Sequence, residues 1–163
     1  MSARRAPPVF LDIDGVLLGP ERDKQHRFAL AEHALELLAF ALARTEVVFL
    51  SPHARGGTAP AIAHLVAHAK ASDRERLLTL AAAVRPCAYR TLRTEALPPD
   101  GSFLWLDDDP DPAEVEFLRQ RGWLDRWLWV DTREDPADLA RAQRWLAGKL
   151  AAPPRPAAGG AQA

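Results

Sequence analysis

Short, almost continuously apolar runs recur along the chain, and between them apolar residues return every three or four positions. The short runs are typical of strands buried in a parallel sheet, and the wider spacing is typical of amphipathic helices. Strands that alternate with helices predict an α/β fold whose parallel sheet carries helices on both faces. The predicted strands occupy residues 9–11, 46–51, 86–91, 102–106 and 127–130.

The same pattern places the helices and the loops. Helices are predicted over residues 28–44, 58–70, 73–84, 112–121 and 136–150. Residues 19–27 are polar and charged and are expected to form a loop, and residues 93–97 are expected to form a turn or a short helix. The prediction is one domain over residues 9–150, with a short N-terminal arm at 1–8 and a disordered Pro/Ala/Gly-rich tail at 151–163.

Polar residues stand where three of the predicted strands end. Asp12 and Asp14 follow the first strand, Ser51 ends the second, and Asp107 with Asp108 follows a later one. Parallel α/β sheets bind their ligands at the carboxyl ends of the strands. These side chains are therefore expected to converge, although they come from distant parts of the chain.

The segment Val9–Leu17 carries the strongest chemical signal. Extended backbone would put Asp12 and Asp14 on one side of the strand, where two carboxylates repel each other unless a cation or a catalytic use compensates. Gly15 permits the sharp turn that brings backbone N–H groups round the site. Turns at strand exits also favour Asp, but a calcium loop is excluded because residues 16–18 are apolar where it needs oxygen ligands.

The same segment resembles the first motif of the haloacid dehalogenase-like (HAD) phosphatase superfamily, an apolar strand followed by Asp-x-Asp-Gly. The resemblance covers residues 9–150 and implies a three-layer, Rossmann-like HAD fold. It implies that Asp12 is the nucleophile that attacks phosphorus, and that Asp14 is the general acid and base. Residues 19–27 lie at the position of the family's cap and are too few to build a large cap domain.

The acids at the end of the strand at 102–106 resemble the family's fourth motif, an apolar strand followed by paired acids or by acids four positions apart. Asp107 is expected to bind metal directly, and Asp108 or Asp111 to hold metal-bound water, with Asp108 preferred. A carboxylate that attacks a phosphate dianion needs a bridging cation, and Mg²⁺ suits because it takes hard oxygen ligands. The implied Mg²⁺ site consists of Asp12, Asp14, Asp107 and Asp108.

The second and third motifs match less closely. Ser51 resembles the strand-end Ser or Thr that hydrogen-bonds a phosphoryl oxygen, and substrate binding is also expected at Gly15. The family uses a Lys to neutralise the nucleophile and the phosphate. The corresponding position here is Arg93, which can make a bidentate phosphate contact, and Lys70 is the alternative.

The histidines and the cysteine are expected to play lesser roles. His64 and His68 stand four positions apart on a predicted helix, but no Glu follows His64 as a zinc protease motif requires. Half-buried or surface positions are therefore expected for both. His53 is expected to sit in its loop, the alternative being that it orients substrate. Cys87 is expected to be small, buried and unreactive.

Composition narrows the class of protein. The chain of 163 residues has a formal charge of −1, which does not favour bulk electrostatic binding of nucleic acid or anionic membranes. A single cysteine fits a reducing compartment. The sequence shows no signal-peptide pattern and no run of about 18 apolar residues, so a cytoplasmic protein without a membrane partner is predicted.

Three functions are consistent with these residues. The first is a Mg²⁺-dependent phosphomonoester hydrolase that forms an aspartyl-phosphate on Asp12 from a phosphorylated substrate. The second is a nucleic-acid end-processing phosphatase, similar to the small HAD domains of RNA-repair proteins. It would need a basic groove made by Arg22, Lys24, Arg27, Arg55 and Arg93. The third is a non-catalytic HAD-fold binding module, which the altered third motif favours and the intact Asp12–Asp14 pair opposes.

Overall fold

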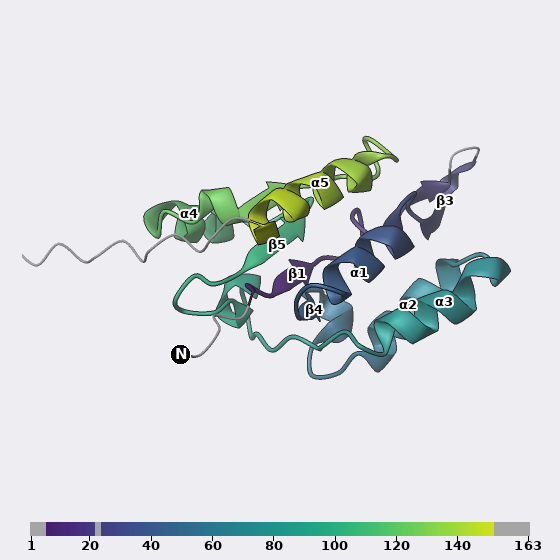
Figure 1. Ribbon diagram of the computed structural model, residues 1–163, viewed down its shortest axis with the longest axis horizontal. Coiled ribbons are helices and arrows are strands. Elements are labelled where there is room, and N and C mark those ends of the chain that lie inside the picture. The colour runs from purple at the N-terminus through teal and green to yellow at the C-terminus, as the bar shows by residue number, and fades with distance from the viewer. Residues whose placement is uncertain (1–5, 22–23, 152–163) are drawn as a thin grey trace, which may run out of the picture.

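The computed structural model describes residues 6–21 and 24–151 (Figure 1). Most of the predicted arm at 1–8 and nearly all of the predicted tail at 151–163 therefore lie outside the described residues. Within them, a parallel sheet is flanked by helices, so the predicted α/β class is confirmed.

The sheet has four parallel strands in the order β4-β1-β5-β6. Their bounds are Val9–Leu11 for β1, Val47–Phe49 for β4, Leu104–Asp107 for β5 and Trp127–Trp129 for β6. Strand β1 lies in the interior, with Leu11 paired to Phe49 on one side and to Leu106 on the other. This register brings the residues that follow each strand to one edge of the sheet.

The strand order places the topological switch point of the sheet between β1 and β5. After β1 the chain turns to β4 on one side, and after β5 it turns to β6 on the other. Loops that leave neighbouring strands in opposite directions open a gap at the carboxyl edge, which is where α/β sheets bind ligands. Asp12 follows β1 and Asp107 ends β5, so both acids lie at this switch point.

Five α-helices and three short 3₁₀ helices make up the rest of the described fold. Helices α1 and α5 pack against each other, and α2 packs on α3 (Figure 1). The α-helices are α1 (Ala34–Leu42), α2 (Ala59–His68), α3 (Ala71–Ala81), α4 (Pro112–Gln120) and α5 (Asp138–Ala151). The 3₁₀ helices are η1 (Pro52–Ala54), η2 (Arg93–Ala96) and η3 (Leu124–Arg126).

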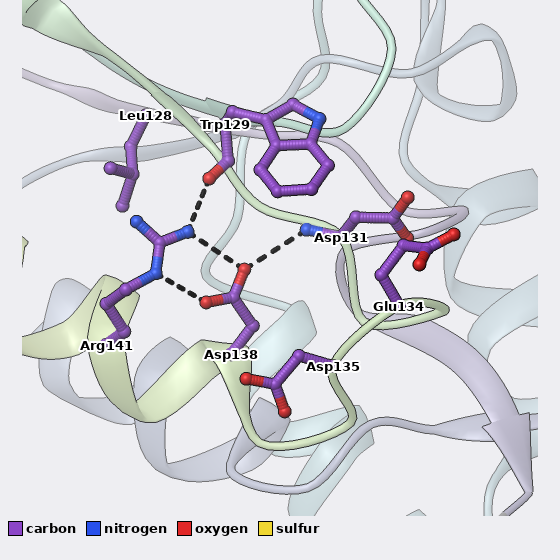
Figure 2. Close-up of a pocket in the computed structure, with 7 residues that line it drawn as sticks. All are labelled: Leu128, Trp129, Asp131, Glu134, Asp135, Asp138 and Arg141. Atoms are coloured by element: carbon purple, nitrogen blue, oxygen red, sulfur yellow. Dashed lines mark hydrogen bonds and ion pairs between the residues drawn. The ribbon is translucent and has the colours of Figure 1, made fainter.

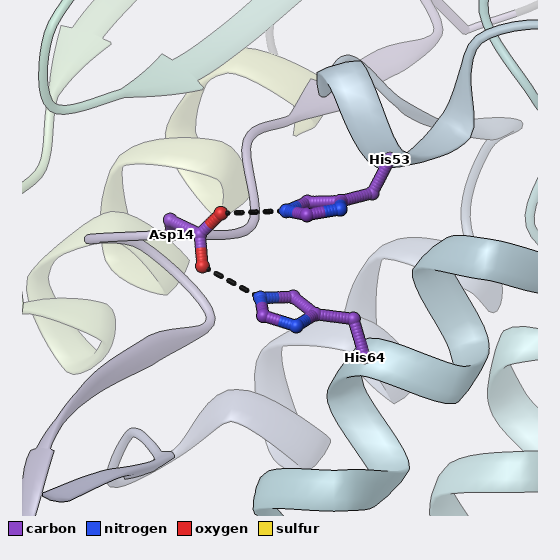
Figure 3. A group of neighbouring side chains, drawn as sticks. All are labelled: Asp14, His53 and His64. Atoms are coloured by element: carbon purple, nitrogen blue, oxygen red, sulfur yellow. Dashed lines mark hydrogen bonds and ion pairs between the residues drawn. The ribbon is translucent and has the colours of Figure 1, made fainter.

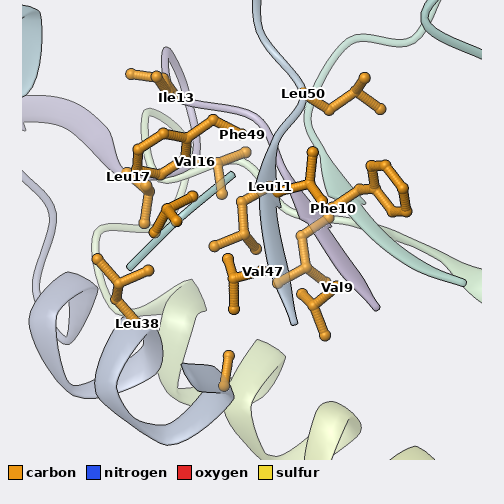
Figure 4. Packing of buried hydrophobic residues seen from close by; sticks show 14 of the residues in the cluster. Val9, Phe10, Leu11, Ile13, Val16, Leu17, Leu38, Val47, Phe49 and Leu50 are labelled. Carbon is orange, nitrogen blue, oxygen red and sulfur yellow. The ribbon is translucent and has the colours of Figure 1, made fainter. Parts of the chain in front are cut away.

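Apolar side chains anchor the strands that carry the acids. Val9 and Leu11 of β1 pack with Phe49 of β4 and Leu38 of α1, and all four are almost fully buried (Figure 4). Burying a side chain of this size stabilises a fold by roughly 1.5–3 kcal/mol. The strand ends are therefore fixed, and the acids that follow them have little freedom to move apart.

The prediction of a loop at residues 19–27 is wrong. This region forms an antiparallel hairpin of β2 (Leu18–Glu21) and β3 (Lys24–Leu30), which packs against α2. The Cα of Gly19 meets Thr132 too closely for any side chain, so the hairpin is fixed at its base. Because β3 runs to Leu30, helix α1 begins at Ala34 and not at the predicted residue 28.

The prediction of a strand at residues 86–91 is also wrong. Within these residues only one isolated bridge forms, between Cys87 and Arg55, and a second pairs Arg85 just before them with Val48. Pro86 lacks an N–H group and cannot donate a hydrogen bond to a ladder, which disfavours a regular strand here. None of the helices in the described part of the chain has the length and apolar character that crossing a lipid bilayer requires.

Candidate metal and phosphoryl site

Three carboxylates meet at the switch point between β1 and β5. Oxygen atoms of Asp12, Asp107 and Asp108 lie within 4.8 Å of one another, and all three residues are buried. The backbone explains the meeting, because Asp12 N donates to Leu106 O at 3.0 Å and so stands beside the end of β5. We call these three residues the acid group.

Arg93 is the cation at the centre of this group. Its Nη1 lies 2.5 Å from Asp107 Oδ2 and 3.4 Å from Asp12 Oδ2. Helix η2 presents this side chain to the acids, since Arg93 is its first residue. Lys70 is exposed at the start of α3 and makes no hydrogen bond or ion pair with the acid group in the described structure. The structure therefore brings Arg93, and not Lys70, to the acids.

A further buried acid holds Arg93 in place. Glu114 is 1% exposed, accepts a hydrogen bond from the backbone N of Arg93, and pairs with its guanidinium at 3.2 Å. Asp111 lies on the other side of Glu114, where it caps α4 through its bond to Ala113 N at 2.8 Å. Asp111 therefore has a capping role outside the acid group, and Asp108 is the residue that stands beside Asp12 and Asp107.

Gly15 is placed for close approach, and its own N–H has a partner within the turn. That group donates to Leu18 O at 2.8 Å, and substrate binding at Gly15 stays a prediction. Gly15 has φ of 82°, and an added Cβ would overlap Asp108. Thr132 Oγ1 donates to Gly15 O at 3.0 Å, which ties the turn to the segment after β6.

Asp108 has a cationic partner that the sequence did not reveal. Nη2 of Arg133 donates to Asp108 Oδ2, and its Nε pairs with Asp131 Oδ1 at 3.1 Å. The Arg133 side chain is 47% exposed, so its guanidinium stands between the acid group and solvent. A second cation at the mouth of the site favours an anionic ligand.

Burial opposes ionisation of the three carboxyl groups. Burial raises the pKa of Asp12 well above its usual range, and the neighbouring Asp107 raises it further. Burial likewise raises the pKa of Asp107 to about 7, and burial raises that of Asp108. Three buried carboxylates with raised pKa values form an oxygen donor set that suits a divalent hard cation such as Mg²⁺. The residues present therefore fit the predicted metal.

Asp14 is not part of the acid group. Its two oxygens contact histidines, with Oδ2 3.0 Å from His53 Nε2 and Oδ1 2.8 Å from His64 Nε2 (Figure 3). Burial opposes ionisation, but the hydrogen bonds from His64 and His53 hold the pKa of Asp14 below its usual range. The expected common side for Asp12 and Asp14 required extended backbone through both residues, but the chain enters a turn at Ile13.

Ser51 stands at the end of β4, one strand away from Asp12. It is fully buried, and its Oγ accepts a hydrogen bond from His53 N at 3.4 Å. That bond occupies an acceptor position and leaves the hydroxyl hydrogen able to donate. Cys87 is buried as expected, its Sγ lies 3.6 Å from Ser51 O, and burial raises the pKa of its thiol.

A separate cavity of about 410 Å³ lies beside β6 and is not lined by the acid group (Figure 2). Its polar groups bind one another: Arg141 pairs with Asp138 at 2.5 Å and donates to Trp129 O at 2.5 Å. The backbone N of Asp131 donates to Asp138 at 3.2 Å. The charged groups Asp138 and Arg141 of this cavity therefore already have partners.

No protein-family model matches the chain, and no curated protein matches it either. The resemblance to HAD phosphatases therefore rests on the motifs in the sequence and on the geometry described above.

Proposed function

We propose that the protein is a Mg²⁺-dependent phosphomonoester hydrolase of HAD type that reacts through Asp12. The observation that carries the proposal is the meeting of Asp12 with Asp107 and Asp108 around the guanidinium of Arg93. Two distant segments supply these acids, and a fold gains nothing in stability from three adjoining buried carboxylates. A site that binds cation and phosphate together accounts for them.

Asp12, Asp107 and Asp108 would hold the metal, which supplies positive charge against the nucleophile and the phosphoryl oxygens. Arg93 would contribute a second positive charge beside Asp12, and the hydroxyl of Ser51 would donate to a phosphoryl oxygen. Arg133 stands at the solvent side of Asp108, where it can meet the arriving phosphate. Together these groups neutralise a dianion that the acid group alone would repel.

The chemistry has two steps. In the first, an oxygen of Asp12 forms a bond to phosphorus while the bond to the leaving oxygen breaks. Asp14 gives that oxygen a proton, for which it must be protonated and turned from His53 and His64 toward the leaving group. In the second, water attacks the phosphorus of the aspartyl-phosphate, and Asp14 accepts the proton of the water. Inorganic phosphate leaves, and both carboxyl groups return to their starting states.

The hairpin β2–β3 stands where the chain of HAD enzymes carries a cap or a flap. It follows directly after the Asp12–Gly15 turn and packs against α2, which bears His64. We take it as a small flap at the edge of the site and expect no separate cap domain. Such an open site suits phosphate esters with large leaving groups as well as small ones.

Hydrolysis of an aryl phosphate, with and without Mg²⁺, tests the proposal. Asp12→Asn should lower kcat by at least about 1,000-fold, because a nucleophile is lost. Asp111→Asn is the matched control: it changes an acid of the neighbouring loop while keeping a residue that caps helices well, and its rate should stay within about twofold. A folded wild-type protein without Mg²⁺-dependent turnover would leave the non-catalytic binding module as the better description.

A substrate screen decides whether the enzyme processes nucleic-acid ends. The predicted groove gains little support, because Arg93 is bound by the acid group and Glu114, and Arg22 and the Lys24 side chain lie outside the described residues. Oligonucleotides with 3′- or 5′-phosphates should be compared with small phosphate esters. A kcat/KM for oligonucleotides at least about tenfold higher would favour end processing.

A further inference from the structure

Asp14, His53 and His64 form a second cluster of ligating side chains, beside the acid group but distinct from it (Figure 3). One ligand atom from each lies within 4.8 Å of the other two. The three residues come from three elements: the turn after β1, the 3₁₀ helix η1 and the helix α2. We call them the histidine group.

The imidazole rings of His53 and His64 both point Nε2 at the carboxylate of Asp14. His53 and His64 stack with ring centroids 4.2 Å apart and planes 24° apart, and each directs Nε2 at a different oxygen of Asp14. Because the rings are stacked and both Nε2 atoms point to Asp14, the two nitrogens and the carboxylate surround one small volume. Figure 3 shows this convergence from separate segments of the chain.

Stability does not explain the cluster. The side chain of Asp14 is 51% exposed, so water would satisfy its oxygens without either histidine. Exposed pairs of this kind contribute about 0–1 kcal/mol each. Two histidines brought to one solvated carboxylate from distant segments are better explained by a ligand that all three groups share.

We propose that Asp14, His53 and His64 bind one divalent transition-metal ion of the Zn²⁺ class. Two imidazoles and one carboxylate are ligands that such ions prefer, whereas Mg²⁺ prefers an all-oxygen set. Zn²⁺ binds imidazole nitrogen and carboxylate oxygen at about 2.0–2.2 Å, which puts tetrahedral ligands roughly 3.3–3.6 Å apart. The oxygen–nitrogen separations of 2.8 and 3.0 Å need to widen by several tenths of an ångström.

The exposure of these side chains leaves one side of the site open to solvent, so water can be the fourth ligand. The two metal sites would therefore differ in donor chemistry. The acid group offers three carboxylates and suits Mg²⁺, and the histidine group offers two nitrogens and one oxygen and suits Zn²⁺.

One consequence rests on the proposed function. Zn²⁺ bound to Asp14 would occupy the carboxylate that gives and accepts the proton, so Zn²⁺ would inhibit Mg²⁺-dependent turnover. Binding of Zn²⁺ does not depend on that function, since it needs only the three side chains. The histidine group would then make the activity sensitive to the concentration of free transition metal.

The test is titration of the metal-free protein with Zn²⁺ by calorimetry, repeated with Co²⁺ and its visible absorption, which reports nitrogen ligands and coordination number. Wild type and Asp12→Asn should each bind about one equivalent at this site. His53→Gln and His64→Gln should weaken binding at least about tenfold, as loss of a ligand does more than loss of an outer partner. His68→Gln is the matched control, because the His68 ring packs edge-on against His64, with centroids 4.9 Å apart, but offers no ligand atom to the group. The variant therefore shows how much packing alone contributes.

Zn²⁺ binding of equal strength in wild type, His53→Gln and His64→Gln would overturn the proposal, as would no binding by wild type. Circular dichroism of each variant checks that the fold is kept. Zn²⁺ binding lost in His64→Gln but kept in His68→Gln supports the site even in a protein that hydrolyses no phosphate. If the protein hydrolyses phosphate esters but the histidine variants bind Zn²⁺ as tightly as wild type, the proposed function stands and only this inference is removed.

Discussion

The α-carbon of Gly15 faces the carboxylate of Asp108 so closely that no side chain fits between them. The turn after β1 and the loop after β5 are thereby packed against each other at the switch point of the sheet. Gly15 also takes a left-handed conformation, with φ of 82°. Glycine is therefore required at position 15 for two reasons, the backbone conformation and the lack of space. Substituting Gly15 and a second glycine that has only the first constraint measures the two effects separately.

Gly15→Ala and Gly56→Ala form this pair. Gly56 has φ of 77° and nothing within 4 Å of an added Cβ, so its substitution meets only the left-handed penalty of about 1–2 kcal/mol. Gly15→Ala meets the same penalty and also displaces Asp108, which adds about 1–3 kcal/mol. Urea denaturation should show the larger loss for Gly15→Ala, together with weaker Mg²⁺ binding. Equal losses of stability in the two variants would show that Asp108 moves aside at no cost in free energy.

Arg93→Ala should be among the most destabilising single changes in the protein. It leaves Glu114 and Asp107, both buried, without the cation that pairs with them. An uncompensated buried charge lowers the free energy of unfolding by about 3–5 kcal/mol. Chemical denaturation near neutral pH measures the loss. A drop below about 1 kcal/mol would mean that these carboxyl groups are protonated in the folded protein and need no partner.

Arg85→Ala is the control for that measurement. Arg85 pairs with Glu46 at 2.8 Å, but the side chains are 65% and 41% exposed. Water replaces such a partner, so the change should stay within about 1 kcal/mol. Each variant removes one guanidinium. Arg85 loses a single exposed partner, whereas Arg93 loses three buried ones, so the difference between the two losses of stability reports on the buried ion pairs.

The positions of the sequence-predicted acids show how far pattern alone reaches. Asp12 and Asp107 could be predicted to meet, because the carboxyl ends of parallel strands share an edge and each acid follows an apolar run. Arg93 could be proposed from its place before β5. Nothing in the sequence indicated that Arg133 pairs with Asp108. Arg133 follows β6, and the packing of that edge strand brings it back to the site.

The histidines and the hairpin show the opposite case. His53 and His64 lie 39 and 50 positions from Asp14, with no spacing that links them, so their meeting depends on how η1 and α2 pack. Glu114 did leave a signal, because it stands three positions after Asp111 in a helix-capping pattern. The hairpin at residues 18–30 has too little alternation for a strand prediction, and its pairing is with itself.

The stability of the metal-free protein should fall as pH rises from about 4 to about 7. Burial raises the pKa of Asp107 to about 7, above the value near 4 expected in the unfolded chain, so the folded protein binds more protons across this range. More protons on the folded state mean that the free energy of unfolding decreases with rising pH. The raised pKa of Asp12 acts in the same direction.

Asp107→Asn should flatten this dependence, because it removes the titrating group, and Asp109→Asn should leave it unchanged, because Asp109 is an exposed neighbour in the same loop. Thermal unfolding measured at several pH values gives the slope for each variant. Saturating Mg²⁺ should raise the melting temperature most at the upper end of the range, where the acids are ionised. A slope of the same size in Asp107→Asn would assign the effect to other groups.

Trp105 lies where it can report on the acid group directly. It is fully buried, its Nε1 donates to Asp107 Oδ2 at 3.1 Å, and its ring lies 5.5 Å from the Arg93 guanidinium. Mg²⁺ at the acid group would change the charge beside the indole, so we expect titration with Mg²⁺ to change the intrinsic fluorescence. Trp105→Phe should lose most of that change and about 1–3 kcal/mol of stability, since Asp107 loses a donor.

Trp145→Phe supplies the comparison, because Trp145 lies on α5 near Lys149, and its indole has no hydrogen bond to the acid group in the described structure. Its fluorescence response to Mg²⁺ should match that of wild type. Because the measurement needs no substrate, it separates metal binding from catalysis: a Mg²⁺ response lost in Trp105→Phe and in Asp107→Asn locates the ion at the acid group. A response that survives in both variants would place the metal elsewhere and would leave the three carboxylates without a cation to explain them.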